Sequence, residues 1–555
     1  MNPAPTNGAG VIINASSPTK DSLDFSECLA AFLSQHKVPT VLLIECSTAA
    51  DAATSTNQLQ PVCTSSTTHL SLTQPLNTHA AFSAAVSLLN LPSSHLAVIQ
   101  LGDKDNLKNA GVDSPPFQGL DQVLHLSPEN NSIRQLFSLV LLHISSVMKR
   151  AYSSLVCIGY SMKQARQKAL TEQNMLPFLP VDGTFFLPVD LEAIAQPFQE
   201  GESEGNRPMV TIAEEMVDVF LHKATDFFED GNEKNKKNET EKEETNTAAS
   251  MATASGSVPQ YRPELKFILD KLHSSGCCII DPLENLEKVI DRVQMAHALD
   301  AACKAARKLA LPVRAPAWHL IEHKFSPDIL RTASTASKVS LPCVVKPQVA
   351  CGIEESHQMA FVLHPSGLHS DLEVPLPALL QEYVDHNSTV WKVYVAGNQV
   401  FSVQKRSTPD LQPLRDFLAS HVSSGEVVGN GGEEEEDLGI PTSIEFNSLE
   451  SLPTSLPWLR RLIDSSDAGT ATLAPVPPAA LMHPGFLTQL AQVFRKHLGL
   501  TLFGFDVVFD YAAGEAVVLD LNFFPSFRGI PEAPVALRTT LLEIYKTHKG
   551  SMLFI

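Results

Sequence analysis

The chain has 555 residues, which is too many for one hydrophobic core, so we expect about two to four domains. An apolar content of 44% is ordinary for a soluble protein, and a formal net charge of −20 at pH 7 argues against nucleic acid or an anionic membrane surface as a partner. Nine cysteines without CxxC spacing give no zinc signature, and no uncharged apolar run reaches membrane-spanning length, so we expect a soluble protein of the cytoplasm, or of cytoplasm and nucleus.

Residues 1–150 alternate short apolar runs with helix-like stretches such as "SECLAAFLSQHK". The apolar runs are "GVIIN", "TVLLIE", "HLAVIQLGD" and "QVLHLS". Strands that alternate with helical patterns predict an α/β layer fold with a parallel sheet. Because this region has neither a Gly-rich phosphate loop nor a nucleophile motif, we treat it as an additional domain whose function its sequence does not disclose.

A second α/β domain is predicted for residues 151–310. In "SSLVCIGYSMKQARQKAL" we expect a strand, a break at Gly-Tyr, and a helix that carries Arg166. The run "VDVFLH" predicts a strand that ends at His222 and Lys223. Bases at strand ends and helix starts suit anion binding, although ordinary solvated bases remain the alternative.

Two polar segments interrupt the chain. Residues 229–257 are charged and then rich in Ser, Thr and Ala, which predicts a disordered insert. Residues 423–439 contain an acidic run in a Gly-rich context. Because clustered glutamates repel one another, this pattern predicts a mobile, solvated surface loop and not a metal site.

The third predicted domain, residues 311–555, begins with clearer signals. "LPCVVKPQVACG" reads as a buried strand that ends at Lys346, and a buried ammonium needs a negative partner. A nucleotide phosphate and a structural carboxylate both remain open as that partner. The run "LPALLQEYVDHNSTVWKVYVAGNQVFSVQKRSTPDL" then predicts strand, loop, strand, tight turn and strand. This antiparallel ribbon carries Lys392, Lys405 and Arg406.

A final hairpin is predicted from "LFGFDVVFDYAAGEAVVLDLNFFPSF", with strands at 502–509 and 516–523. Side chains two positions apart share one face, so Asp520 and Asn522 point the same way, and cross-strand pairing can bring Asp506 close to them. Two carboxylates and an amide oxygen form a donor set suited to Mg²⁺. The alternative is that these acids are turn or edge carboxylates bonded to backbone amides.

The segment "VVLDLNFFPSFRGIP" resembles the metal-binding segment of the inositol-tetrakisphosphate 1-kinase family, also called inositol 1,3,4-trisphosphate 5/6-kinases. Further matches follow in family order over roughly residues 151–540, among them "GYSMKQARQKAL", "VFLHKATD", "IIDPLENLEKVIDR", "LLQEYVDHNSTVWKVYVAG" and "VQKRSTPDL". The "HKATD" form and the extra N-terminal region are most similar to the long plant-type isoform. The resemblance implies a mixed α/β and α+β protein, in which an ATP-grasp kinase core follows an additional Rossmann-like α/β domain.

The resemblance also implies a role for individual residues. The residues implied to bind ATP are Arg292, Lys346, Gln381, Glu382, Tyr383, Val384, Lys392, Ser407 and Ser448. The residues implied to bind an inositol phosphate are Arg166, Lys223, His357, Lys392, Asn522 and Ser526. The residues implied to hold Mg²⁺, with two ions expected per site, are Asp506, Asp520 and Asn522. Among these, the implied catalytic residues are Lys346, Asp520 and Asn522.

Three positions depart from the family pattern. Arg166 replaces a lysine and offers a planar fork in place of a compact charge. Cys351 removes a polar group before Gly352, and Ser526 replaces a glycine near the substrate. These departures leave the preferred inositol phosphate isomer open.

The implied function is therefore transfer of the γ-phosphate of ATP, with Mg²⁺, to a hydroxyl of an inositol tris- or tetrakisphosphate. The expected partners are ATP or ADP and an inositol polyphosphate, without nucleic acid or membrane, and the chain is expected to be a monomer. A non-catalytic inositol phosphate or nucleotide sensor is one alternative, although it would not need the metal residues. An ATP-grasp ligase is another, which would share Lys346 and the metal hairpin but not His357 or "HKATD".

Overall fold

The chain folds into two compact units in the computed structural model. Unit 1 comprises Met1–His222, Pro263–Ile280 and Glu532–Ile555, and unit 2 comprises Lys223–Arg262 and Asp281–Pro531. The structure describes residues 10–15, 29, 40–45, 67–72, 96–101, 123–126, 133–152, 154–195, 209–228, 260–412, 414–416, 441–449 and 484–552. The predicted insert 229–257 and acidic loop 423–439 lie outside these residues. The predicted domain boundaries at 150 and 310 stay predictions.

The N-terminal strands of unit 1 pair in parallel in the order β3-β2-β1-β4-β5. Their bounds are β1 Gly10–Ala15, β2 Thr40–Glu45, β3 Thr67–Leu72, β4 Leu96–Leu101 and β5 Val123–Leu126. Four of them coincide with the predicted apolar runs, whereas β3 was not predicted because "TTHLSL" has few apolar residues. The helix-like stretch at 26–37 falls almost wholly outside the described residues, and a separate domain here stays a prediction.

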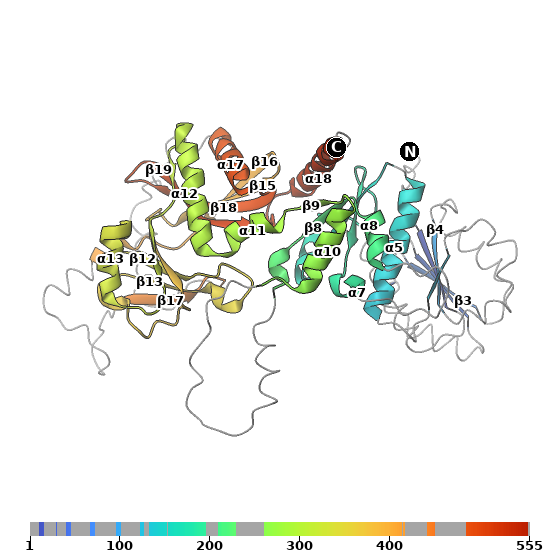
Figure 1. The fold of residues 1–555 in the computed structure, drawn as a ribbon, viewed down its shortest axis with the longest axis horizontal. Helices are drawn as coiled ribbons and strands as arrows, with labels where there is room; N and C mark the ends of the chain where they lie inside the picture. The colour runs from blue at the N-terminus through green and yellow to red at the C-terminus, as the bar shows by residue number, and fades with distance from the viewer. Residues whose placement is uncertain are drawn as a thin grey trace, which may run out of the picture. The chain divides into compact units, whose positions relative to one another are not determined.

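A second sheet of unit 1 has the parallel order β7-β6-β8-β9. Its strands are β6 Val156–Ser161, β7 Thr184–Pro188, β8 Val219–His222 and β9 Cys278–Ile280. The helices of this unit are α5 Ile133–Ala151, α6 Gln164–Glu172, α7 Leu191–Ala195, α8 Met209–Met216, α10 Pro263–Ser274 and α18 Ala533–Met552 (Figure 1). The predicted break at Gly159 is wrong, because β6 continues through it. Glycine is required there for packing, since an added Cβ would lie 2.8 Å from the side chain of Val217.

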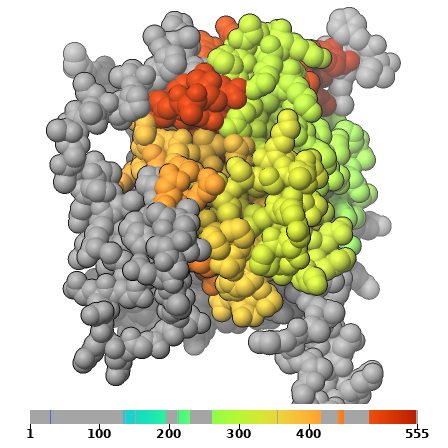
Figure 2. Space-filling view, turned by 90° about the vertical axis from the view of Figure 1, so that its left-hand side faces the viewer, coloured from blue at the N-terminus to red at the C-terminus, as the bar shows by residue number. Residues whose placement is uncertain are grey.

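One sheet of unit 2 has the order β10-β19-β18-β15-β16. Its strands are β10 Val313–Arg314, β15 Thr389–Ala396, β16 Gln399–Arg406, β18 Leu502–Asp510 and β19 Glu515–Phe523. Three helices pack beside it, namely α11 Leu283–Ile290, α12 Arg292–Lys308 and α17 Pro484–Leu498. Figure 2 shows the red-orange surface of α17 against the lime-green surface of α12. The predicted strand-loop-strand-turn-strand ribbon and the predicted final hairpin are both confirmed in this unit.

The other sheet of unit 2 is antiparallel, with the order β11-β14-β12-β13-β17. Its strands are β11 Trp318–Ile321, β12 Cys343–Pro347, β13 Gln358–Val362, β14 Ala378–Glu382 and β17 Ser443–Asn447. Helix α13, Pro327–Ser337, covers its core, and Leu330 and Ala333 of this helix pack among the buried strand residues. The helix begins where the Ser326 hydroxyl accepts a hydrogen bond from the Asp328 amide.

Helix α12 begins at a junction that also organises the loop after β12. The Asp291 carboxylate caps the helix by accepting hydrogen bonds from the amides of Val293 (2.8 Å) and Gln294 (2.9 Å). Its other oxygen accepts a hydrogen bond from the side chain of Gln348 at 2.6 Å. Because the Asp291 carboxylate contacts both the helix and Gln348, Arg292, the first residue of the helix, lies against the end of β12.

Within the part of the chain that the structure describes, no helix is long and apolar enough to cross a membrane.

Candidate active site

The β18–β19 hairpin sets the two predicted metal-binding carboxylates directly opposite each other. Asp506 pairs with Asp520, and Gly504 pairs with Asn522 on the same two strands. The register shifts just after Asp506, where the ladder is irregular. The predicted cross-strand approach of Asp506 to the Asp520–Asn522 face is therefore confirmed, and the acids lie on strands and not in a turn.

Asp506 also faces a lysine on the neighbouring strand. The Lys392 ammonium donates a hydrogen bond to the Asp506 carboxylate at 2.8 Å. Burial raises the pKa of Asp506, Lys392 opposes that rise, and Asp520 adds to it. Burial disfavours the charged form of Lys392, but Asp506 more than offsets this, so the pKa of Lys392 is raised. Asp506 and Asp520 therefore face each other, and burial disfavours the negative charge of Asp506. A positive charge beside these two carboxylates would stabilise them.

The donor set of this hairpin suits a hard divalent cation. Among the described residues, no three side chains of His, Cys, Asp or Glu lie close enough to hold a metal ion. The set on the hairpin instead combines the Asp506 and Asp520 carboxylates with the exposed amide of Asn522. An oxygen-only set with few protein ligands suits an ion that keeps waters and binds phosphate oxygens.

A small pocket lies beside this hairpin in unit 2. Four predicted site residues line it, namely Arg292, Lys346, Gln381 and Asp520. The rest of its lining is largely apolar and consists of Met295, Ala296, Leu299, Ala315, Pro316, Trp318, Leu379 and Leu519. A pocket that combines an apolar lining with two cations and a carboxylate is suited to a planar base that carries phosphates.

Lys346 enters this pocket from β12. Burial of its ammonium group lowers the pKa of Lys346 to about 8, although the carboxylates of Asp520 and Asp506 favour the charged form. Among the described residues, the structure gives this ammonium no hydrogen-bond or ion-pair partner. Of the two partners that the sequence left open, a directly bound structural carboxylate is therefore not found among these residues, and the ammonium is available to a bound anion.

Arg292 has a structural role that the sequence did not indicate. Its guanidinium donates hydrogen bonds to the carbonyl oxygens of Pro347 (2.6 Å), Val349 (2.8 Å) and Ser356 (3.1 Å). Burial lowers the pKa of Arg292, and Asp520 opposes this effect. Arg292 therefore holds both ends of the loop after β12 while it lines the pocket.

The family resemblance implies that the segment from Gln381 to Lys392 is the hinge that holds the nucleotide. This hinge is tied to the segment that follows β16. The Tyr383 hydroxyl donates to the carbonyl oxygen of Pro409 at 2.7 Å, and the Ser407 amide donates to the carbonyl oxygen of Ser388 at 2.8 Å. Val384 packs in a small apolar cluster with Val390, Val508 and Val517. These contacts place Ser407, a predicted nucleotide residue, beside the hinge.

His357 and Ser448, which the resemblance assigned to different ligands, contact each other directly. The Nδ1 atom of His357 lies 3.0 Å from the Ser448 hydroxyl, and the Ser448 amide donates to the carbonyl oxygen of His357 at 2.9 Å. Burial lowers the pKa of His357, the Arg292 charge lowers it further, and Asp520 opposes both. The imidazole is therefore neutral at neutral pH in the free protein.

The remaining predicted substrate residues lie in three places. The Lys223 ammonium donates to the carbonyl oxygen of Phe523 and lies 4.9 Å from the centre of that ring, next to Asn522. Ser526 is exposed and does not have a positive φ, so serine strains no backbone where the family has glycine. Arg166 belongs to unit 1, where it lies in the first turn of α6.

The other ribbon bases separate onto two faces. Lys405 lies opposite Val390 and Arg406 opposite Thr389 in the β15–β16 pair. Directly opposed residues share a face, so Lys405 lies on the same face as Lys392 and Arg406 lies on the other.

Gly352 follows Cys351, which is one of the positions that depart from the family pattern. Glycine is required at position 352 for two reasons. Its φ is +92°, and a Cβ added there would overlap the ring of Phe228. We predict that Gly352→Ala lowers the free energy of unfolding by about 2–4 kcal/mol, from backbone strain and overpacking together. The measurement is urea unfolding, with Gly529→Ala as the control, since Gly529 has a φ of +86° but no atom within 4 Å of an added Cβ. Equal losses in the two variants would contradict a role for the Phe228 contact.

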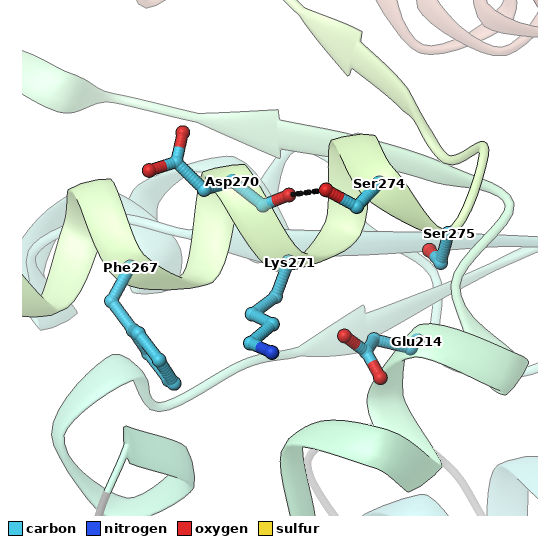
Figure 3. Close-up of a pocket in the computed structure, with 6 residues that line it drawn as sticks. All are labelled: Glu214, Phe267, Asp270, Lys271, Ser274 and Ser275. Atoms are coloured by element: carbon cyan, nitrogen blue, oxygen red, sulfur yellow. Dashed lines mark hydrogen bonds between the residues drawn. The ribbon is translucent and has the colours of Figure 1, made fainter.

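An open hollow in unit 1, drawn in Figure 3, contains none of the predicted site residues. Glu214 reaches it from α8, and the other lining residues come from α10 and the turn after it (Figure 3). The Ser274 hydroxyl donates to the carbonyl oxygen of Asp270 at 2.7 Å, and the Lys271 ammonium lies 5.9 Å from the ring centre of Phe267. These are ordinary surface contacts of a helix.

Comparison with known families places unit 2 in a defined class. Residues 313–445 and 464–543 match the family described as the inositol 1,3,4-trisphosphate 5/6-kinase ATP-grasp domain. The predicted ATP-grasp, mixed α/β fold is therefore confirmed for this part of the chain.

Curated relatives match over longer stretches. "Inositol-tetrakisphosphate 1-kinase 1" of Zea mays is 30% identical over 278 residues, which are 49% of this chain and 69% of that protein. "Inositol-tetrakisphosphate 1-kinase 6" of Oryza sativa subsp. indica is 29% identical over 467 residues, which are 83% of this chain and 70% of that protein. Because 83% of this chain exceeds the part after position 150, the rice alignment includes some of the N-terminal region.

Solved structures give weaker matches. A RiPP-associated ATP-grasp ligase of Chryseobacterium gregarium, in complex with ADP and with leader and core peptides, matches with a TM-score of 0.36 and 10% identity over 72% of this chain and 97% of that one. Macrocyclase MdnC of Microcystis aeruginosa matches with a TM-score of 0.34 and 10% identity over 70% of this chain and 100% of that one.

Proposed function

Because the chain belongs to the inositol-tetrakisphosphate 1-kinase family, we propose that it transfers the γ-phosphate of ATP to a hydroxyl of an inositol tris- or tetrakisphosphate in an Mg²⁺-dependent reaction. The observation that carries the proposal is the pocket in which Arg292, Lys346, Gln381 and Asp520 meet an apolar lining. Phosphoryl transfer requires positioning and neutralisation of charge more than covalent chemistry by the protein, and this pocket is equipped for both.

ATP occupies this pocket in the proposal. The apolar lining receives the base, and Gln381, the first residue of the hinge, lines the same pocket. Lys346 binds phosphate oxygens, since its ammonium is close to Asp520 and is available to an anion. Arg292 contributes charge while it fixes the loop after β12.

Asp506, Asp520 and Asn522 would hold Mg²⁺, with two ions per site. When bound, Mg²⁺ would supply positive charge that offsets the negative charge of the phosphates. Lys392 keeps Asp506 oriented through their 2.8 Å ion pair, and the Leu521 amide orients Asp520 by a 2.9 Å hydrogen bond. These contacts hold the two carboxylates at fixed places on a rigid hairpin.

The inositol phosphate is bound by several bases, because it carries several phosphates. His357, Lys223 and Lys392 of unit 2 are the proposed set, and Asn522 and Ser526 contact the substrate, whereas a substrate role for Arg166 stays a prediction. A local basic cluster of this kind is compatible with the net charge of −20. The arginine at 166, the cysteine at 351 and the serine at 526 are where we expect isomer preference to be decided.

Separate measurement of ADP and of free inorganic phosphate distinguishes this proposal from its alternatives. We expect inositol polyphosphate to stimulate ADP formation from Mg-ATP without equal release of inorganic phosphate, since a kinase keeps the phosphate on the acceptor. A ligase would release both in equal amounts and would require a carboxylate and an amine. A sensor would bind the ligands and form neither product.

We also propose that the protein is a monomer of the cytoplasm or of cytoplasm and nucleus, which sedimentation and fractionation can test.

The lowered pKa of His357 gives a pH prediction. In the free protein the imidazole is neutral near pH 7, whereas a bound phosphate favours the imidazolium, so binding takes up a proton. Affinity for the inositol phosphate should therefore rise as pH falls from about 8 towards 6, until the pKa of the free protein is reached.

Isothermal titration of the wild type and His357→Gln, in buffers of different ionisation enthalpy, measures this proton uptake. His323→Gln is the matched control, because His323 is 89% exposed and forms an ion pair with Glu322. Equal proton uptake by the wild type and His357→Gln would contradict the substrate role of His357.

A further inference from the structure

Arg314 joins the two sheets of unit 2 at one point. It is the last residue of β10, in the sheet that carries the metal hairpin, whereas Glu382 is the last residue of β14, in the other sheet. The two side chains form a bidentate pair, with Nη1 to Oε2 at 2.7 Å and Nη2 to Oε1 at 2.8 Å. Only a guanidinium can make two parallel hydrogen bonds of this kind to one carboxylate.

The same guanidinium is anchored to the turn of the metal hairpin. Its Nη2 donates to Asp510 at 3.0 Å, and its Nε lies 2.9 Å from Glu515, at the two ends of the β18–β19 turn. Asp510 also accepts hydrogen bonds from the amides of Ala512 and Ala513, which close that turn. The side chains of Arg314 and its three acidic partners are only 16–22% exposed, so solvent screens these pairs less than it screens a surface ion pair.

The neighbours of this pair form the proposed nucleotide pocket. Ala315 and Pro316, which directly follow Arg314, line it, and so does Gln381, which directly precedes Glu382. The Ala317 amide donates to the Glu382 carboxylate at 2.9 Å, and the Glu382 amide donates to the carbonyl oxygen of Ala317 at 2.8 Å. The ion pair between Arg314 and Glu382 thus positions the neighbouring pocket residues of both sheets.

We propose that Arg314 is a positioning residue for the nucleotide: through Glu382 it fixes the hinge strand β14 to the β18–β19 hairpin and so sets the width of the pocket between them. This inference rests on the proposed function, because it requires a nucleotide in that pocket. It also gives Glu382 a role distinct from direct contact with ATP, since its carboxylate is occupied by Arg314 and by the Ala317 amide.

The consequence is a selective effect on the nucleotide. Arg314→Lys keeps the positive charge but loses the bidentate hydrogen bond to Glu382, so β14 is held less firmly at the pocket. We expect the dissociation constant of Mg-AMP-PNP to rise about tenfold, equivalent to one lost charge-assisted hydrogen bond. The KM for inositol phosphate and the kcat at saturating ATP should change by less than about threefold, because neither depends on the width of the unliganded pocket.

The experiment compares Arg314→Lys, Glu382→Gln and the double variant with the wild type, by calorimetric titration with Mg-AMP-PNP and by kinetics. The control is Arg331→Lys, which makes the same substitution at a 77% exposed arginine that pairs with Asp328. If Arg314 acts through Glu382, the double variant binds the nucleotide no more weakly than the weaker single variant.

Each outcome is decisive for the proposal. Weaker nucleotide binding by both single variants, without further loss in the double variant, supports it. Nucleotide binding within about twofold of the wild type in Arg314→Lys overturns it, and so do additive losses, which indicate that Glu382 contacts ATP independently. If Arg314→Lys does not fold, nucleotide binding by Glu382→Gln within about twofold of the wild type overturns the proposal. A wild type that binds no Mg-AMP-PNP refutes the proposed function itself and not this inference alone.

Discussion

Asp520→Asn is expected to lower kcat for phosphate transfer by about a hundredfold to a thousandfold while the protein stays folded. Asparagine keeps the shape of the side chain and can still accept the 2.9 Å hydrogen bond from the Leu521 amide, so the hairpin is retained. It removes one of the two facing carboxylates to which we assign Mg²⁺ binding. The measurement is the initial rate over a Mg²⁺ titration, with thermal unfolding as the test of fold.

Asp328→Asn is the matched control for this substitution. Asp328 is 81% exposed and pairs with Arg331 on α13, so its loss should leave the rate within about twofold of the wild type. An Asp520→Asn protein that keeps a near-normal rate at limiting Mg²⁺ would contradict the assignment of Asp520 as a metal ligand.

Lys346→Met is expected to raise the KM for ATP by about tenfold to a hundredfold, because one charge-assisted contact to a phosphate is lost. Methionine has a similar length and is tolerated by the apolar strand β12, whose neighbouring residue Val345 is fully buried. Removal of a buried ammonium should not lower stability. A KM for ATP within about twofold of the wild type would remove Lys346 from the nucleotide site.

The pKa of Lys346 adds a test by pH. Burial lowers this pKa to about 8 in the free protein, and bound phosphates favour the charged form and raise it again. ATP affinity should therefore be constant well below pH 8 and weaken above it, as the free protein loses the proton that binding requires. Lys346→Arg should abolish this dependence above pH 8, because arginine stays charged. A wild type whose ATP affinity is unchanged between about pH 7 and 9.5 would contradict the mechanism.

Period-two spacing was sufficient to predict the β18–β19 hairpin and the shared face of its acids. Asp520 and Asn522 had to share a face because strand side chains alternate, and the turn at "DYAAGE" brought Asp506 within pairing range. Spacing alone did not predict that Asp506 and Asp520 lie directly opposite each other. That register depends on the irregularity after Asp506, which leaves no signal in the apolar pattern.

Other features were not predicted because they depend on tertiary packing. The Arg314 network joins residues that are far apart in the chain, and no local pattern links Arg314 with Glu382. Gly159 indicated a break, yet it lies inside β6 because Val217 leaves no room for a Cβ. The apolar lining of the pocket, including Trp318, has no local pattern that distinguishes it from other apolar sequence. The individual roles came from the family resemblance, and their assignment to ATP, inositol phosphate or metal stays a prediction.

Transfer of labelled γ-phosphate from ATP to a panel of inositol tris- and tetrakisphosphates tests the central claim most directly. The purified wild-type protein is incubated with Mg²⁺, labelled ATP and each panel member, and the products are separated by phosphate number and isomer. We expect label in a product with one additional phosphate for at least one panel member, and none with Asp520→Asn. A folded wild-type protein that binds ATP but labels no member of the panel would contradict it.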